Sequence, residues 1–247
     1  MTSQSTGMLG ILELDEGLSL DTDPLAPREG SLLNPETFGR PIIAEMVEGA
    51  FAEVVIRGEA SLEGACISAA RKLARRGARV IAADCGFLIR HQAAISAAVD
   101  VPVITSSLLL IPTLLRQIGP AKKLAVLTAD SRHLGEDLLG LKNAHDRERI
   151  VIGGIEGGVY VRNALARPFV RTDVDQIEQE VADQIDRLRR KHPEIGILLF
   201  ECTGFPVVTK ALRHKTGLPI YDITDLCKLT LATAPDPKGG RNCPHLV

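Results

Sequence analysis

The sequence predicts an α/β protein in which helices cover parallel sheets. Short apolar runs of strand length alternate with helix-length segments along most of the 247 residues, an order typical of βαβ units. Aromatic residues are only 3% of the chain and tryptophan is absent, so Ala, Leu, Ile and Val supply most of the 45% that is apolar. Such a core suits helices packed on a parallel sheet. The length allows one large or two small domains.

The first elements are separated by a long loop. A short apolar run, Met8 to Leu14, precedes a Gly-, Pro- and Asp-rich stretch from Asp15 to Arg40, and a loop of that length is often functional. The segment Pro41 to Ile56 fits a helix and a strand equally. Apolar residues then recur at helical spacing from Leu62 to Leu73, before Gly77, which is a typical C-terminal stop.

From residue 78 onward the two types of element alternate. Apolar runs and turn residues predict strands at Ala78–Asp84, Val101–Thr105, Lys123–Thr128, Arg149–Gly153, Ile195–Glu201 and Leu218–Asp222. Helical patterns lie at Phe87–Val99, Leu108–Ile118, His133–Leu141, Thr172–Lys191, Pro206–Lys215 and Asp225–Ala234. Thr172 is the expected N-cap of the longest helix, which carries acids in its first turn and basic residues at its far end.

We divide the chain into four parts. A lobe over 1–120 carries Cys85, and a lobe over 121–215 carries Cys202. A C-terminal strand and helix over 216–234 return toward the first lobe, and 235–247 is a loose tail.

The charge balance excludes several classes of protein. Lys plus Arg (29) nearly cancel Asp plus Glu (31), for a formal charge of −2, which argues against binding to nucleic acid or a membrane surface. The N-terminus has no secretory pattern, and no apolar stretch reaches about 18 residues. Five irregularly spaced cysteines do not form a disulfide framework. We therefore expect a cytoplasmic protein.

Two of the predicted strands run into a cysteine. Cys85 and Cys202 follow them directly, and ligands of parallel sheets bind at the carboxyl ends of strands. A helix N-terminus lowers the pKa of a thiol, and both turns supply one. Two such thiols on opposite faces of a carbon can exchange its proton. A free cysteine is equally often a small core residue, as we interpret Cys66 and Cys227, while Cys243 lies in the tail.

Five short motifs resemble those of the aspartate/glutamate racemase superfamily. They are Asn34-Pro35-Glu36-Thr37-Phe38, Asp84-Cys85-Gly86-Phe87, Val103-Ile104-Thr105-Ser106-Ser107, Leu127-Thr128-Ala129-Asp130 and Glu201-Cys202-Thr203. The resemblance covers most of the chain, and Glu-Cys-Thr is its most specific part. It implies two pseudo-symmetric lobes with the active-site cleft between them, and a dimer or larger homo-oligomer.

The resemblance also implies the chemistry. Cys85 and Cys202 are the acid/base thiols, without pyridoxal phosphate or metal, and Thr203 binds the substrate carboxylate. The sequence also lacks the CxxC and HExxH motifs that are typical of metal sites. Gly86 and Phe87 replace the Asn and Thr or Ser that amino-acid racemases commonly carry. The superfamily includes hydantoin racemases, maleate isomerases, arylmalonate decarboxylases and a dimethylsulfoniopropionate-lyase branch, so the substrate stays open.

A substrate carboxylate needs several donors in a small space. The candidates lie in the early loop or near strand ends: Asn34, Thr37, Gly86, Ser106, Ser107, Thr128 and Thr203. Thr203 ranks first and Asn34 second, although Ser and Thr at such places are as often helix caps. In a strand, the side chains of Asp84 and Glu201 would point away from the cysteines. His91 and His133 are within possible reach of the cleft, but an isolated histidine is more often a surface or capping residue.

The sequence thus predicts an enzyme that moves the α-proton of a small carboxylate with two cysteines, and racemisation is the leading reaction. A lyase or decarboxylase of the same superfamily, such as a dimethylsulfoniopropionate lyase, is the alternative. A redox-active cysteine pair and a non-catalytic binding protein are the remaining hypotheses.

Overall fold

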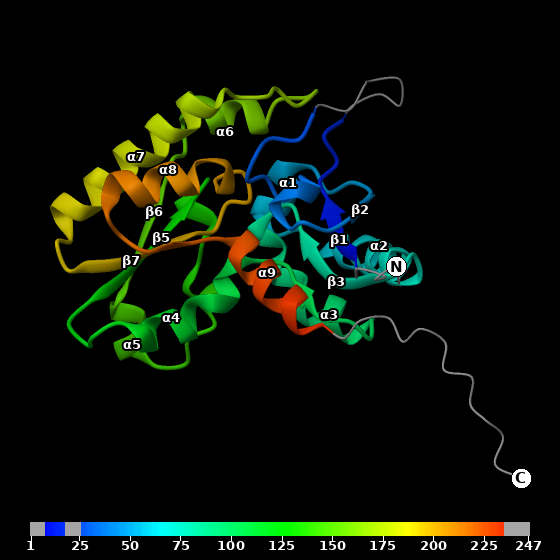
Figure 1. The fold of residues 1–247 in the computed structure, drawn as a ribbon, viewed down its shortest axis with the longest axis horizontal. Coiled ribbons are helices and arrows are strands. Elements are labelled where there is room, and N and C mark those ends of the chain that lie inside the picture. Colours follow the sequence, from blue (N-terminus) through cyan, green and yellow to red (C-terminus); the bar gives the residue numbers. More distant parts are fainter. Residues whose placement is uncertain (1–7, 18–25, 235–247) are drawn as a thin grey trace, which may run out of the picture.

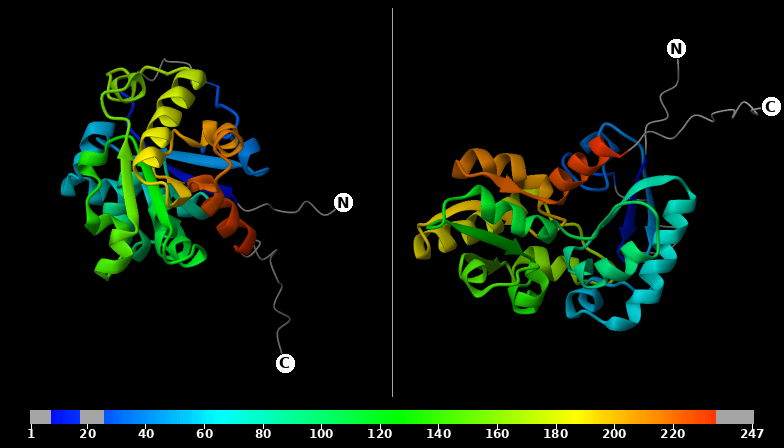
Figure 2. Two further views of the ribbon diagram at one scale, coloured as in Figure 1. Left: turned by 90° about the vertical axis from the view of Figure 1, so that its left-hand side faces the viewer. Right: turned by 90° about the horizontal axis from the view of Figure 1, so that it is seen from below.

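Two four-stranded parallel sheets form the framework of the protein (Figures 1 and 2). The structure is a computed structural model that describes residues 8–17 and 26–234. The first sheet has the order β2-β1-β3-β4, with β1 at Met8–Glu13, β2 at Ile42–Met46, β3 at Ala78–Ala83 and β4 at Val103–Ile104. The second has the order β6-β5-β7-β8, with β5 at Lys123–Thr128, β6 at Ile150–Gly154, β7 at Ile195–Phe200 and β8 at Ile220–Tyr221. Because both sheets have the same pairing order, the predicted two-lobed α/β fold is confirmed.

Helices flank both sheets and connect their strands (Figure 1). They are α1 (Ala52–Arg57), α2 (Glu63–Arg75), α3 (Gln92–Ala97), α4 (Ile111–Gln117), α5 (Ala144–Glu148), α6 (Val159–Ala164), α7 (Val174–Lys191), α8 (Pro206–Thr216) and α9 (Ile223–Thr233). The helical spacing of the sequence explains the longest of them, since Ile177, Val181 and Ile185 of α7 all face the core.

Two of the predicted helices begin as 3-10 turns. A third predicted helix is absent from the structure. Phe87–Val99 becomes a 3-10 helix at Gly86–His91 followed by α3, and Leu108–Ile118 becomes one at Ser107–Leu110 followed by α4. His133–Leu141 is not an α-helix, because Gly135 separates two 3-10 turns and Gly140 ends the second with φ +65°.

Two other segments also differ from expectation. The ambiguous Pro41–Ile56 contains both β2 and all of α1 but its last residue, separated by a turn at Gly49 with φ +75°. The N-cap of α7 is Asp173 rather than Thr172. Thr172 is instead buried, and its hydroxyl accepts a hydrogen bond from Asn163 at 2.9 Å.

The segment 216–234 divides between the two lobes. β8 pairs with β7 in the second sheet, whereas α9, drawn in red near the centre of Figure 1, packs against β3 and β4 of the first. Asp222 joins them: its carboxylate accepts hydrogen bonds from the Thr224 amide at 2.7 Å and the Thr209 hydroxyl at 2.6 Å, and it forms a capping box with Asp225. The predicted tail, 235–247, lies outside the described residues.

The two lobes also share a core. The largest buried apolar cluster contains Ile81 of β3 together with Val126 of β5 and Leu199 of β7. Ser107, in the first lobe, donates a hydrogen bond to the Phe200 carbonyl of the second at 2.7 Å. These contacts hold the ends of β3 and β7 in one place. Across the two described ranges, we find no helix with the length and apolar character needed to cross a membrane.

Asp222 is 2% exposed, and its loss leaves several buried donors without an acceptor. We expect Asp222→Ala to lower the free energy of unfolding by about 2 to 3 kcal/mol, measured by urea denaturation. Asp173→Ala is the matched control, because Asp173 caps α7 without a side-chain hydrogen bond, and its effect should stay within about 0.5 kcal/mol. Equal effects of the two changes would contradict this role for Asp222.

Candidate active site

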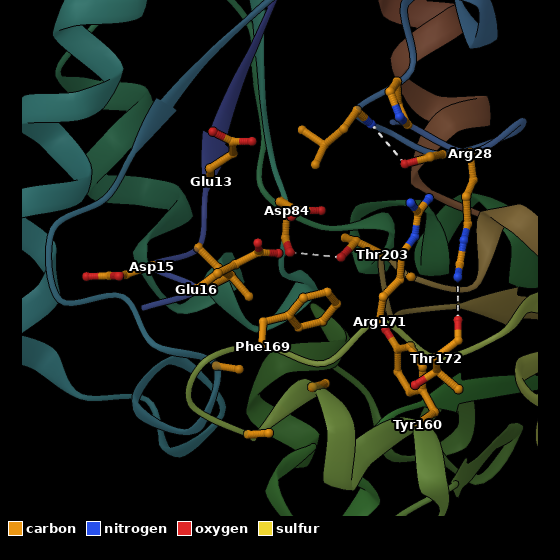
Figure 3. Close-up of a pocket in the computed structure, with 18 of the residues that line it drawn as sticks. Glu13, Asp15, Glu16, Arg28, Asp84, Tyr160, Phe169, Arg171, Thr172 and Thr203 are labelled. Carbon is orange, nitrogen blue, oxygen red and sulfur yellow. Dashed lines mark hydrogen bonds between the residues drawn. The ribbon is translucent and has the colours of Figure 1, made fainter. Parts of the chain in front are cut away.

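The two cysteine-bearing turns meet at the carboxyl ends of β3 and β7. Asp84 and Glu201 lie one residue past these strands, and the Thr203 hydroxyl donates to the Asp84 carbonyl at 2.9 Å (Figure 3). The thiols of Cys85 and Cys202 are partly buried and form no disulfide. Burial is the main cause that raises the pKa of Cys85, and the charges of Glu201 and Cys202 add to it. The structure therefore brings the two predicted thiols to one place.

The first turn presses directly on the second at Gly86. A Cβ atom at this position would overlap both the carboxylate and the carbonyl oxygen of Glu201. The Glu201 Oε2 atom accepts a hydrogen bond from Thr128 at 2.7 Å, while its buried Oε1 atom has no partner. Burial raises the pKa of Glu201 to about 7, which the Thr128 hydrogen bond and the charge of Arg90 partly counteract.

The predicted lowering of the thiol pKa is wrong. Burial raises the pKa of Cys202 to about 12 and that of Cys85 well above its usual value, and the charge of Glu201 adds to both shifts. Backbone hydrogen bonds at Phe87 and Gly204 lower the pKa of Cys85 and Cys202, respectively, as expected, but the effect of burial is larger. Burial therefore favours the protonated form of both thiols.

A cavity of about 700 Å³ lies beside these turns and is lined by both lobes. Asp84, Tyr160, Thr203 and Gly204 connect it to the cysteines, although neither cysteine is among the lining residues. The carboxylates of Glu13, Glu16 and Asp84 lie on one side of it and the guanidinium groups of Arg28 and Arg171 on another (Figure 3). The cavity therefore has an acidic pole and a basic pole.

The acidic pole consists of carboxylates at the ends of β1 and β3. Burial and mutual repulsion raise the pKa of Glu13 and of Asp84, and burial raises that of Glu16. Among the described residues, none forms an ion pair with these three carboxyl groups. The described residues also contain no group of His, Cys, Asp or Glu side chains arranged to hold a metal ion. The pole thus holds carboxyl groups whose ionised form no basic side chain of the described residues stabilises by an ion pair.

The basic pole is formed by Arg28 and Arg171. Backbone carbonyls position them: Arg28 donates to Thr172 at 2.5 Å and Arg171 to Ala26 at 2.8 Å. Burial and the neighbouring charge of Arg171 lower the pKa of Arg28. Neither guanidinium forms a salt bridge within the described part of the chain. Two adjacent cations of this kind suit an anionic group such as a carboxylate.

Most of the predicted polar residues use their side chains within the protein. Asn34 accepts from the Glu36 amide, Thr37 donates to the Ser31 carbonyl, Ser106 accepts from the Leu108 amide, Ser107 donates to the Phe200 carbonyl and Thr128 donates to Glu201. Of the predicted set, Thr203 alone lines the cavity. A substrate contact by any of them stays a prediction.

The two histidines lie away from the cavity lining. His91 is buried, and burial lowers its pKa. The His133 Nδ1 atom lies 3.2 Å from the Asp130 carboxylate.

Sequence patterns do not single out the residues that give the cavity its charged and aromatic lining. Arg28 lies in the long loop that the sequence marks as functional, so its position was signalled but its role was not. Tyr160, one of two tyrosines in the chain, follows the glycine-rich segment 153–158, which does not mark it as a site residue. No sequence motif marks Arg171 or Phe169 as site residues, because only the tertiary fold brings them to the cavity.

Glu201 gives the stability of the protein a specific pH dependence. Its pKa is about 7 in the folded state against 4.5 in the unfolded chain, so its contribution is present below pH 4.5 and is lost as the pH rises to 7. Between pH 5 and 8, we expect wild type to lose about 2 to 3 kcal/mol more unfolding free energy than Glu201→Gln. Parallel pH profiles of the two proteins in urea denaturation would contradict this assignment.

Comparison with known proteins gives relatives of two kinds. No protein-family model matches the chain. It is 29% identical over 207 residues to a dimethylsulfoniopropionate lyase of Durusdinium sp. clade D, covering 79% of this chain and 67% of that protein. It is also 29% identical over 253 residues to dimethylsulfoniopropionate lyase 3 of Emiliania huxleyi, covering 96% of this chain and 63% of the relative. The chain thus spans about two thirds of the length of these curated relatives.

The similar solved structures are racemases and a decarboxylase. Aspartate racemase of Picrophilus torridus matches with a TM-score of 0.56 at 14% identity, covering 94% of this chain and 95% of that one. Arylmalonate decarboxylase matches with a TM-score of 0.53 at 18% identity, covering 94% and 96%. The chain therefore shares the fold of aspartate racemase and arylmalonate decarboxylase, and the two sequence relatives named above are dimethylsulfoniopropionate lyases.

Proposed function

We propose that the protein is a cofactor-independent lyase that uses Cys85 and Cys202 to eliminate a cationic leaving group from a small carboxylate, as in dimethylsulfoniopropionate. The observation that carries this proposal is the cavity beside the paired thiols, with its acidic and basic poles on different sides. The lyases among the sequence relatives support the same reaction type.

The cavity complements a molecule that carries opposite charges at its two ends. Arg28 and Arg171 provide charge-assisted donors for a carboxylate. Glu13 and Asp84 provide carboxyl groups whose ionised form a bound cation would stabilise, and Phe169 lines the same cavity (Figure 3). A sulfonium has no N–H donors, so carboxylate charge and aromatic faces are the groups suited to hold it.

The elimination needs one base. A cysteine thiolate removes the proton from the carbon next to the carboxylate, so that a C–H bond breaks and an S–H bond forms. The electron pair forms the Cα–Cβ double bond, and the Cβ–S bond breaks with its electrons going to sulfur. Dimethylsulfoniopropionate would give acrylate and neutral dimethyl sulfide. The arginines stabilise the charge that develops on the carboxylate.

Racemisation is the second candidate. One observation favours it: the two cysteines follow strands of different lobes, an arrangement that suits two-base exchange on opposite faces of one carbon. The fold shared with aspartate racemase agrees with it. In that reaction one thiol removes the α-proton and the other returns a proton to the opposite face, so no other bond breaks.

The compartment and assembly state belong to the same proposal. Four free cysteines in the described residues support a reducing cytoplasm. The resemblance to the superfamily supports a homo-oligomer.

Proton NMR in D₂O distinguishes these reactions. We expect wild type to convert dimethylsulfoniopropionate to acrylate, and serine in place of the cysteine that acts as base to lower the rate by about 100-fold or more, with a smaller effect at the other cysteine. Cys227→Ala is the control, because this cysteine is buried beside the first sheet, in α9, and its rate should stay near that of wild type. Deuterium entering Cα of aspartate or glutamate without cleavage would support racemisation. Tight binding without turnover would indicate a binding protein.

Removing a basic-pole cation should weaken substrate binding. For Arg28→Gln we expect KM to rise about 10- to 100-fold with a smaller change in kcat, because the lost contact is a charge-assisted hydrogen bond of about 1.5–3 kcal/mol. Arg75→Gln is the control, since Arg75 is a last-turn residue of α2 outside the cavity lining. Steady-state kinetics in which both variants retain the wild-type KM would rule out the basic pole as the carboxylate site.

A further inference from the structure

We propose that Tyr160 is a further catalytic residue, whose hydroxyl donates a hydrogen bond to the Cys202 thiolate and so makes Cys202, rather than Cys85, the base. This inference rests on the proposed function. It makes the two thiols chemically unequal, which neither the motifs nor the relatives indicate.

The first support is the position of the phenol. The Tyr160 hydroxyl lies 3.3 Å from the Cys202 sulfur, which is hydrogen-bonding distance for sulfur. Tyr160 lines the cavity whereas Cys202 does not, and Figure 3 shows its ring on the second-lobe side. The phenol thus lies at the boundary between the sulfur and the space that would hold substrate.

The second support is the number of features that fix this phenol. The Glu180 carboxylate of α7 accepts hydrogen bonds from the amides of Val159 at 2.6 Å and Tyr160 at 3.3 Å, which anchors the first turn of α6. The ring packs on Phe205 with centroids 5.7 Å apart. A Cβ atom at Gly204 would overlap the phenol oxygen, so only glycine fits there without displacing it.

The third support is the balance of charges around the Cys202 sulfur. Glu201 and Asp84 disfavour its thiolate electrostatically, and Cys85 is a second ionisable group nearby. The Tyr160 hydroxyl and the Gly204 amide are the donors that favour it. Burial, Cys202, Asp84 and Cys85 all hold the pKa of Tyr160 well above its usual range, so the phenol keeps its proton and acts as donor.

The surroundings of Cys85 are different. Glu201 opposes its thiolate too, but the donor that favours ionisation is the Phe87 backbone, with no side-chain hydroxyl. Cys202 is therefore the thiol that ionises, and Cys85 stays protonated. During elimination the α-proton moves to the Cys202 sulfur, while Tyr160 retains its own. One base suffices for elimination, whereas racemisation needs two groups that exchange roles.

Tyr160→Phe tests this, because it removes the hydroxyl and keeps the ring. Alkylation by iodoacetamide, followed by peptide mass spectrometry across pH 7 to 10, reports each thiol separately. We expect the Cys202 rate to fall about 10-fold at a given pH, as loss of one hydrogen bond to a charged group implies, with the Cys85 rate unchanged. With dimethylsulfoniopropionate, kcat should fall by a similar factor and KM by less than about 2-fold.

Tyr221→Phe is the matched control. Tyr221 is the other tyrosine of the chain, and its hydroxyl donates to Gln117 at 3.3 Å, on an exposed part of the molecule. This variant should leave both thiols and turnover unchanged. An unchanged Cys202 rate in Tyr160→Phe would overturn the proposal, as would an equal change at Cys85 and Cys202. Alkylation needs no substrate, so failure of the proposed lyase activity appears separately, as a wild type without turnover.

Discussion

The close approach of Gly86 to Glu201 is the contact on which the site depends. It lets the turn after β3 lie directly on the turn after β7, and the hydrogen bond from Thr203 to the Asp84 carbonyl holds them together. The same contact buries a carboxylate with one unpartnered oxygen beside both thiols. The charge of Glu201 raises the pKa of both thiols, so the protonation of Glu201 is coupled to that of the cysteines.

The cavity extends this electrostatic pattern away from the thiols. Glu13 and Asp84 repel each other at one pole, and Arg28 and Arg171 repel each other at the other. Neither pole is neutralised by the fold, so a ligand with opposite charges at its two ends relieves both repulsions. Such like-charge groupings reduce the stability of the folded protein, and functional sites are where proteins retain them.

The sequence predicts the fold and the thiols because both depend on local patterns. The periodicity of α7 and the apolar runs of β3 and β7 define the alternation, and the cysteines follow strands directly. The sequence does not predict that burial reverses the shift of the thiol pKa, because burial is a tertiary property. Tyr160 and Arg171 also reach the site through tertiary packing. The predicted helix at 133–141 fails for a local reason, since Gly135 interrupts it.

The central proposal is that Cys85 and Cys202, carried by opposite lobes, lie close enough to act on one small molecule. Bridging with 1,3-dichloroacetone tests it most directly, because two cysteine sulfurs displace its two chlorides in turn. The account predicts one major product in mass spectrometry, a bridge between Cys85 and Cys202, which forms in wild type and is absent from Cys85→Ser. Separate single adducts on the two cysteines, or bridges to Cys66 or Cys227 instead, would contradict it.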